Sequence, residues 1–463
     1  MATHRASIAV VSGLVLVLVL AGRWAAANPS KCPPVEKTEH RYVGAAACAS
    51  QNCHGSAEPR SLSATSLQNE FLIWYQEDRH ARAYTNLEGD RGQQIGRRLH
   101  IAATEDPRCR ACHAPDVAGD ATKCSERVDC ADTPDCDATK CRIRVRDGVT
   151  CEACHGPASA WLEPHTRRDW DPSCSIGLGM LETNRPEEAV KACLDCHIGS
   201  EKRTIQRVDH DLLAAGHPPL AFEIDSFATV MPAHWARSAG NEGWFDGHAW
   251  AAGQVAAVQR AALLFVDQVG KPGWPDFAAY DCQSCHHEVS SGPWARRDSN
   301  GRPKLDGARR PGMKALVEVV AKEHGPAMRD DTEEMAKAAT PGHGGADVRD
   351  AVGRVEKTTA ALLGTVPSAE LGDRRLRLLM QKIVDLADET SGLGFRAAQQ
   401  SAWALESLVD ARSELLGDKE RKTYPEVRAA IGRVYDGLGN PNRYDPVRTE
   451  RSIRAVGTAL AAK

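Results

Sequence analysis

The stretch Cys151-Glu-Ala-Cys154-His155 decides how this chain is built. Two cysteines separated by two residues and followed directly by histidine form the attachment pattern of c-type heme. The two thiols add to the two vinyl groups of the porphyrin, and the histidine then has the iron within reach. The spacing is strict because the porphyrin fixes the positions of both vinyl groups.

The same pattern occurs three more times, and a looser version precedes them all. In the loose copy, Cys48-Ala-Ser-Gln-Asn-Cys53-His54, four residues separate the thiols; a bulged loop still permits attachment, and a Cys48–Cys53 disulfide is the alternative. The predicted thioether cysteines are Cys48, Cys53, Cys109, Cys112, Cys151, Cys154, Cys193, Cys196, Cys282 and Cys285. The predicted proximal iron ligands are His54, His113, His155, His197 and His286. The sequence therefore predicts five hemes c, four of them on strict motifs.

Each iron also has a distal position, which a second protein ligand fills in electron-transfer hemes and which stays open for substrate chemistry. The chain has more than enough other histidines, so counting them does not reveal an open site. Context favours five distal candidates: His80, His165, His210, His217 and His234. His100, His248 and His287 are reserves, whereas His40, His324 and His343 are expected to be surface residues.

The context differs from one candidate to the next. His165 follows its motif through Gly156-Pro157, where the chain can turn back over a heme. His217 lies in a turn fixed by flanking glycine and prolines, and His80 lies on an aromatic-rich helix. An ordinary surface or core histidine is the alternative for each of them.

Residues 1–27 are typical of a cleavable secretory signal, with a basic start, an apolar run at 8–20 and cleavage near Ala27. An uncleaved anchor is the alternative, although a spanning helix needs about 20 apolar residues. We expect a periplasmic or otherwise extracytoplasmic protein, which agrees with c-type attachment. The formal charge of −4 offers no basic face for nucleic acid.

Six cysteines lie outside the motifs: Cys32, Cys124, Cys130, Cys136, Cys141 and Cys174. An exported protein can form disulfides, and six cysteines allow three of them without revealing the pairing. Four of the six lie in a polar insertion, residues 117–147, which we expect to be a disulfide-linked surface loop. A structural zinc site is the alternative, weakened by the absence of a Cys-x-x-Cys pair.

Domain organisation follows the cysteines. Residues 28–303 are the predicted pentaheme cytochrome c domain, and residues 304–463, which hold no cysteine, a C-terminal α-helical domain. Helices are expected in the first over 62–87, 93–103, 186–193 and 248–269, and in the second over 313–325, 346–364, 371–390, 395–416 and 447–461. Two apolar stripes, Leu376-Leu379-Met380-Ile383-Leu386 and Phe395-Ala398-Ala402-Leu405-Leu408, favour an antiparallel helical array. A partner-docking surface is the alternative for these stripes.

Three segments resemble the cytochrome c-552/c-554 family of multiheme cytochromes: Tyr42-Val-Gly-Ala-Ala-Ala-Cys48, Trp74 to His80-Ala-Arg-Ala-Tyr84, and Cys151-Glu-Ala-Cys-His-Gly-Pro157. Residues 214–223 and 274–287 are similar to larger secreted, planctomycete-like members. The resemblance covers about residues 40–297. It implies a mainly α, loop-rich fold organised around stacked hemes, mostly bis-His ligation, and His80 and His165 at distal positions. The first gap, the Cys-rich insertion and the fifth heme depart from the family pattern.

These features predict a secreted pentaheme cytochrome that carries electrons between redox partner proteins. The alternative is a multiheme oxidoreductase that acts on a small nitrogen or sulfur species at one five-coordinate heme. Against it, all five motifs end in histidine and no Cys-x-x-Cys-Lys occurs. A third hypothesis is that the C-terminal helices dock the cytochrome onto a membrane complex.

Overall fold

The computed structural model describes residues 32, 40–60, 66–115, 145–167, 170–203, 205–235, 242–272, 274–282, 285–286, 305, 310–338, 345–387, 394–417 and 424–461. Over these residues the chain is helical without strands, apart from one isolated bridge between Tyr280 and Leu305. This confirms the predicted mainly α fold class. The signal segment, the insertion cysteines, His287 and His343 lie outside the described residues.

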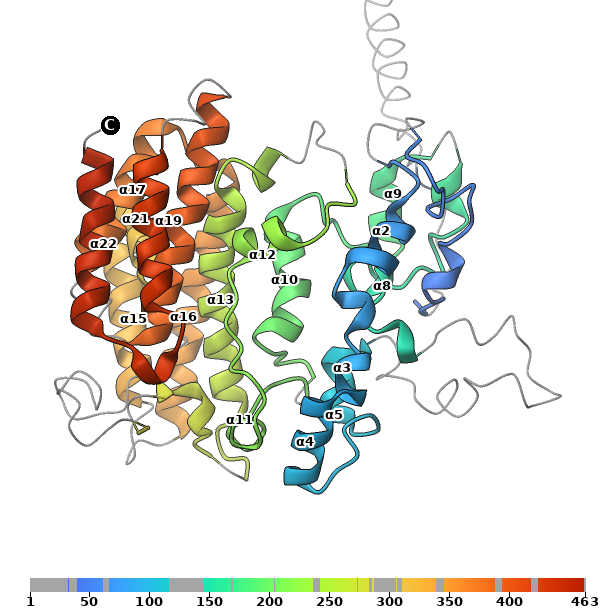
Figure 1. Ribbon diagram of the computed structural model, residues 1–463, viewed down its shortest axis with the longest axis horizontal. Coiled ribbons are helices and arrows are strands. Elements are labelled where there is room, and N and C mark those ends of the chain that lie inside the picture. The colour runs from blue at the N-terminus through green and yellow to red at the C-terminus, as the bar shows by residue number, and fades with distance from the viewer. Residues whose placement is uncertain are drawn as a thin grey trace, which may run out of the picture. The chain divides into compact units, whose positions relative to one another are not determined.

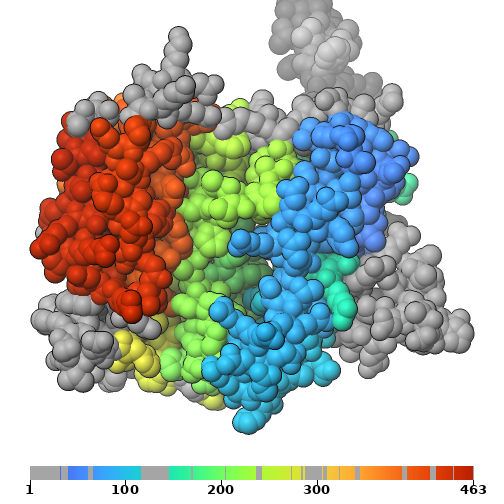
Figure 2. Space-filling view, viewed as in Figure 1, coloured from blue at the N-terminus to red at the C-terminus, as the bar shows by residue number. Residues whose placement is uncertain are grey.

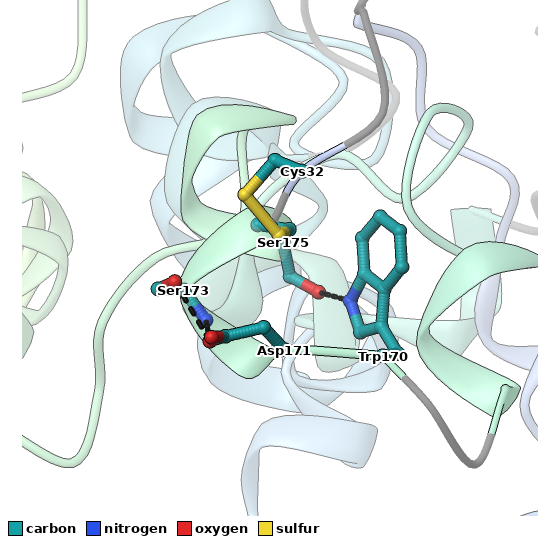
Figure 3. Close-up of a disulfide and its surroundings, with 6 residues drawn as sticks. Cys32, Trp170, Asp171, Ser173 and Ser175 are labelled. Carbon is teal, nitrogen blue, oxygen red and sulfur yellow. Dashed lines mark hydrogen bonds between the residues drawn. A yellow bond between two sulfur atoms is a disulfide. The ribbon is translucent and has the colours of Figure 1, made fainter. Parts of the chain in front are cut away.

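The chain divides into two compact units, which we describe separately. The first consists of residues up to Arg41 together with Pro157–Met180, and a Cys32–Cys174 disulfide joins its two segments. Helix α9 (Pro172–Gly177) begins at Asp171, whose carboxylate accepts the N–H of Ser173. The Trp170 indole donates to the Ser175 hydroxyl across 2.8 Å (Figure 3). This unit is too small to bury a large apolar core, and the disulfide helps to hold its two segments together.

The second unit, Tyr42–Gly156 with Leu181–Lys463, contains all five motifs and begins with short elements. In chain order these are η1 (Ala45–Ala47), α2 (Glu70–Glu77), η2 (His80–Arg82), α3 (Thr85–Glu88), α4 (Asp90–Leu99), α5 (Pro107–His113), η3 (Val145–Asp147) and α8 (Cys151–His155). After Leu181 follow α10 (Pro186–His197), α11 (His210–Ala215), α12 (Ile224–Val230), η5 (Glu242–Trp244), α13 (His248–Asp267) and η6 (Phe277–Ala279). Helices α10 and α13 lie close to their predicted positions.

The single helix predicted over residues 62–87 is wrong. Helix α2 ends at Asp78, which adopts an extended conformation and accepts the backbone N–H of His80 at 2.9 Å. A side-chain acceptor of this kind competes with the helix for backbone donors. The predicted second helix is displaced to residues 90–99, because His100 takes a left-handed conformation with φ of 56° and ends it.

Helix α13 is the central helix of the second unit, between α10 and the C-terminal helices (Figure 1). It is long and apolar enough to span a membrane, but 67% of its apolar window is buried, which makes it a core helix of the described chain. At Gly253 an added Cβ would lie 2.6 Å from Ile224 of α12, so a glycine here lets the two helices approach.

The C-terminal residues form the helical array predicted from the apolar stripes. Its helices are α14 (Pro311–Val319), α15 (Gly325–Ala338), α16 (Gly345–Thr365), α17 (Asp373–Asp385), α19 (Phe395–Leu416), α21 (Pro425–Gly437) and α22 (Pro446–Ala461). Leu379 and Leu405, one from each stripe, are fully buried. Helices α15 and α21 were not predicted. One continuous apolar cluster runs from Trp250 of α13 to Val456 of α22.

Two adjacent leucines of α17 give a matched test of this core. Leu379 is 0% exposed and Leu378 is 47% exposed. We predict that Leu379→Ala lowers the free energy of unfolding by about 2–5 kcal/mol, because it leaves a cavity. The control Leu378→Ala should change it by less than about 0.5 kcal/mol. Urea denaturation of the holoprotein followed by circular dichroism measures both, and equal midpoints would contradict the assignment of the stripe to the core.

Candidate heme sites

Three strict motifs lie at the ends of helices. His113, His155 and His197 are the last residues of α5, α8 and α10. In a helix, residues three and four positions apart lie on one face, so both thiols and the imidazole of each motif point to the same side. Pro107 and Pro186 begin two of these helices, and Thr150 caps the third. The fifth motif is described at Cys282, Cys285 and His286, which are exposed.

Three predicted distal histidines lie opposite motif histidines at nearly one distance. The ring centroids are 6.1 Å apart for His80 and His197, and 6.5 Å apart for His155 and His234. They are 6.3 Å apart for His210 and His286. A metal–imidazole bond is about 2 Å and the ring centre lies about 1 Å beyond the nitrogen, so two imidazoles on opposite sides of one iron are separated by about 6 Å.

The fourth distal candidate lies near the second motif. Burial lowers the pKa of His217, and the nearby charge of His113 acts in the same direction. The fifth candidate, His165, belongs to the first unit. Its role as a distal ligand stays a prediction.

A second observation concerns the other ring nitrogen. Iron is bound through one nitrogen, and a hydrogen bond at the other fixes the tautomer and the ring orientation. In seven of the ten candidate ligands Nδ1 lies next to an acceptor: His54 to Glu70, His80 to Asp78, His113 to the Ala83 carbonyl, His155 to the Thr183 hydroxyl, His165 to the Trp161 carbonyl, His217 to the Pro218 carbonyl and His234 to the Pro232 carbonyl. With Nδ1 engaged in this way, Nε2 is the ring nitrogen that would bind a metal.

The reserve histidines behave differently. His248 uses both ring nitrogens within the protein, Nδ1 with Asp246 and Nε2 with the Ala369 carbonyl at 2.8 Å. His100 is an exposed residue that terminates α4. These two therefore have structural roles in the described chain.

The electrostatics of the motif histidines suit metal binding. Burial lowers the pKa of both His155 and His197 to about 4, so these imidazoles are neutral at pH 7, which is the form that binds a metal. For Glu70, burial raises the pKa, but hydrogen bonds from His54 and from the backbone outweigh it and hold the pKa at about 2. The Glu70 carboxylate is therefore charged beside the first motif.

Neighbouring motifs are in contact. The Cys48 and Cys151 thiols lie close enough to shift each other's pKa, lowering that of Cys48 and raising that of Cys151, and the Cys196 and Cys112 thiols do the same. The first motif thus lies beside the third, and the second beside the fourth. Figure 2 shows that the surface between the blue and the green segments is hollowed.

Residues that the sequence reasoning missed hold the motifs in place. Glu152, which is 1% exposed, accepts the backbone N–H groups of Val43 and Gly44 at 2.7–3.0 Å and so ties the first motif to the third. Arg260 of α13 pairs with Asp195 inside the fourth motif. It also donates to the Gly199 carbonyl at 2.8 Å. Glu152 lies inside the third motif and Arg260 contacts the fourth, but the partners of both are distant in sequence. Sequence reasoning therefore had no signal for either contact.

His80 is positioned by the loop that precedes the third motif. Its carbonyl accepts the Val149 N–H at 3.0 Å, and the Val149 carbonyl accepts the Trp74 indole at 3.0 Å. Gly148 has φ of 68°, and a Cβ there would lie 2.6 Å from the His80 carbonyl. Only glycine fits this approach without strain.

Helix-borne cysteine pairs whose histidines are oriented for metal binding define a c-type cytochrome, a class of electron-transfer proteins with covalently bound heme. Residues 47–156 match the model of the family described as cytochrome c554 and c-prime. This match covers the first three motifs and confirms the predicted resemblance over these residues. Neither the curated proteins nor the solved structures contain a match to the chain.

Glu152 provides a test of how the motifs are held. Glu152→Ala leaves the buried N–H of Gly44 and the half-buried N–H of Val43 without this acceptor, and we predict a loss of about 2–3 kcal/mol in the free energy of unfolding. Glu152→Gln keeps one carbonyl oxygen and should lose less. The control Glu58→Ala removes an exposed carboxylate near the first motif and should lose almost nothing. Denaturation midpoints that fall most for Glu152→Ala, less for Glu152→Gln and hardly at all for Glu58→Ala would support the assignment. An unchanged midpoint for Glu152→Ala would refute it.

Proposed function

We propose that this protein is a secreted pentaheme c-type cytochrome that carries electrons between redox partner proteins. The observation that carries the proposal is the set of three histidine pairs at 6.1–6.5 Å, each joining one motif histidine to one predicted distal ligand. When bound, heme c supplies an iron that accepts and releases one electron. Two imidazoles at each such iron favour electron transfer, because no coordination position is left for substrate.

Three of the proposed ligand pairs follow from the ring contacts, and the pairing of His217 follows from the influence of His113 on its pKa. His217 serves the second motif, His234 the third, His80 the fourth and His210 the fifth. For the third and fourth motifs, the Pro232 carbonyl and the Asp78 carboxylate hold Nδ1 of the distal ring, so that Nε2 is available. Because the acceptor at His80 is a charged carboxylate, the His80 imidazole would be a more basic iron ligand than that of His234.

The motif contacts also support a continuous route. Because the first motif touches the third and the second touches the fourth, cofactors bound there would be close neighbours. The chain's part in electron transfer is then to hold them at short separation, to exclude water between them and to set the local charge.

Export and partner binding belong to the same proposal. The signal-like residues 1–27 support delivery outside the cytoplasm, where c-type attachment takes place. The C-terminal helices are the proposed docking part for a membrane complex, and Leu415 of α19 is 51% exposed.

Leu415→Lys should then slow reduction of the cytochrome by native membranes, whereas an unchanged rate would exclude this part of the surface.

Mass spectrometry of the purified holoprotein tests the heme count. We predict the mass of the processed polypeptide plus five hemes. Changing Cys48 and Cys53 together to serine should reduce the count by one, because their thioether bonds are lost. A wild-type protein with four hemes and a Cys48–Cys53 disulfide would contradict the assignment of the first motif.

Spectroscopy tests the ligand pairs. We predict that His234→Asn converts one of five irons from low spin to high spin, because the third motif loses its distal ligand. His100→Asn is the matched control: asparagine tolerates the left-handed conformation at this helix end, and the spectrum should not change. Electron paramagnetic resonance and nitric oxide binding measure the high-spin fraction. A high-spin iron already present in the wild type would favour the alternative of an oxidoreductase with one five-coordinate heme.

A further inference from the structure

Helix α2 holds a candidate iron ligand at each of its ends. At its first residue, the Glu70 carboxylate lies 2.9 Å from Nδ1 of His54, the proximal candidate of the first motif. Directly after its last residue, the Asp78 carboxylate lies 3.0 Å from Nδ1 of His80, the distal candidate of the fourth motif. One short helix therefore places a negative charge against an axial ring of two different motifs.

The second and third motifs have uncharged acceptors instead. Backbone carbonyls hold Nδ1 of His113, His217 and His234, and the Thr183 hydroxyl lies next to Nδ1 of His155. These four rings are the proposed ligands of the second and third motifs. Among the described residues, carboxylate-held rings thus belong to the first and fourth motifs and not to the second or third.

Both carboxylates are held in place by hydrogen-bond donors. Glu70 Oε1 accepts the N–H groups of Leu67 at 2.6 Å and Gln68 at 3.1 Å and the Ser66 hydroxyl at 3.0 Å, which leaves Oε2 for His54.

The Asp78 carboxylate is fixed in a similar way. Its Oδ1 also accepts the backbone N–H of His80 at 2.9 Å, and its side chain is 6% exposed. Within the described residues, the ion pairs of Glu70 and Asp78 are to histidine and not to lysine or arginine. Their negative charge therefore acts on the axial rings without a neighbouring cation to neutralise it.

The charge of the acceptor affects the iron through the ring. An imidazole whose Nδ1–H donates to a carboxylate is a more basic ligand at Nε2 than one whose Nδ1–H donates to a neutral oxygen. A more basic ligand stabilises ferric iron over ferrous iron, because the ferric state carries one more positive charge. Hydrogen bonding to the axial ligand is therefore one of the means by which a protein sets a heme potential.

We propose that Glu70 and Asp78 are positioning residues that keep the hemes of the first and fourth motifs at lower potential than those of the second and third. The inference rests on the proposed function, because it requires heme at these motifs. It adds a direction to the route. The first motif lies beside the third and the second beside the fourth, so each neighbouring pair joins one low-potential heme to one of higher potential.

Potentiometric titration of the purified holoprotein, followed by electron paramagnetic resonance, tests the proposal. Glu70→Gln and Asp78→Asn keep the size of the side chain and remove its charge. Each should raise the midpoint potential of one heme more than that of any other and shift one low-spin signal, and the double variant should raise two. Glu77→Gln is the matched control, because it removes an exposed carboxylate from the same helix; it should cause no comparable shift.

Mass spectrometry and spin state separate this inference from the proposed function. Five hemes and low-spin irons in the variants, together with potentials that move no more than in Glu77→Gln, would overturn the inference alone. A wild-type protein in which His54 or His197 has no heme attached beside it would overturn the pentaheme function as well. A purely structural role for the two carboxylates would change the denaturation midpoint and leave the potentials of the folded protein as they are, which also counts against the inference.

Discussion

The distance between two imidazoles is the constraint on which the second unit depends. A histidine can serve as a reliable axial ligand only when its ring is held, and the ring is held through Nδ1. Carbonyls, a hydroxyl and two carboxylates perform this task at seven of the candidate ligands. Because these acceptors come from turns and helix ends, the short elements of this region are what allows so many rings to be held. In a long regular helix most carbonyls already accept an N–H group of the helix and would not be available to a histidine ring.

Polar contacts between distant segments replace a large apolar core in the region of the motifs. Its apolar clusters are small, such as the one formed by Ala45, Trp74 and Ala81. Glu152 and Arg260 instead join segments that carry different motifs. Buried charges of this kind contribute little net stability, but a buried charge that loses its partner is strongly destabilising. Arrangements of the chain that separate the partners are therefore disfavoured. These charges specify how the motifs are placed more than they stabilise the chain.

The sequence was most informative where the chemistry is local. A Cys-x-x-Cys-His motif and an apolar stripe such as that of α17 are contained in a few residues, so their positions could be predicted. The break at Asp78 was missed because aromatic spacing outweighed one acidic residue. The role of Glu152 was missed because its partners are 108 and 109 residues away. No pattern within a short window contains such contacts. The sequence does not reveal which cysteine pairs with Cys32, and the structure shows that it is Cys174.

Helix α13 has a consequence for how the protein can be divided. One side of it holds the fourth motif through Arg260, and its apolar residues share a continuous cluster with α14 to α22. The C-terminal array is therefore not a detachable module. A truncated cytochrome that ends near residue 304 would expose a wide apolar strip to water, and such surfaces promote association between chains. Recombinant versions of the heme-bearing part need the array for solubility, whatever partner the array binds.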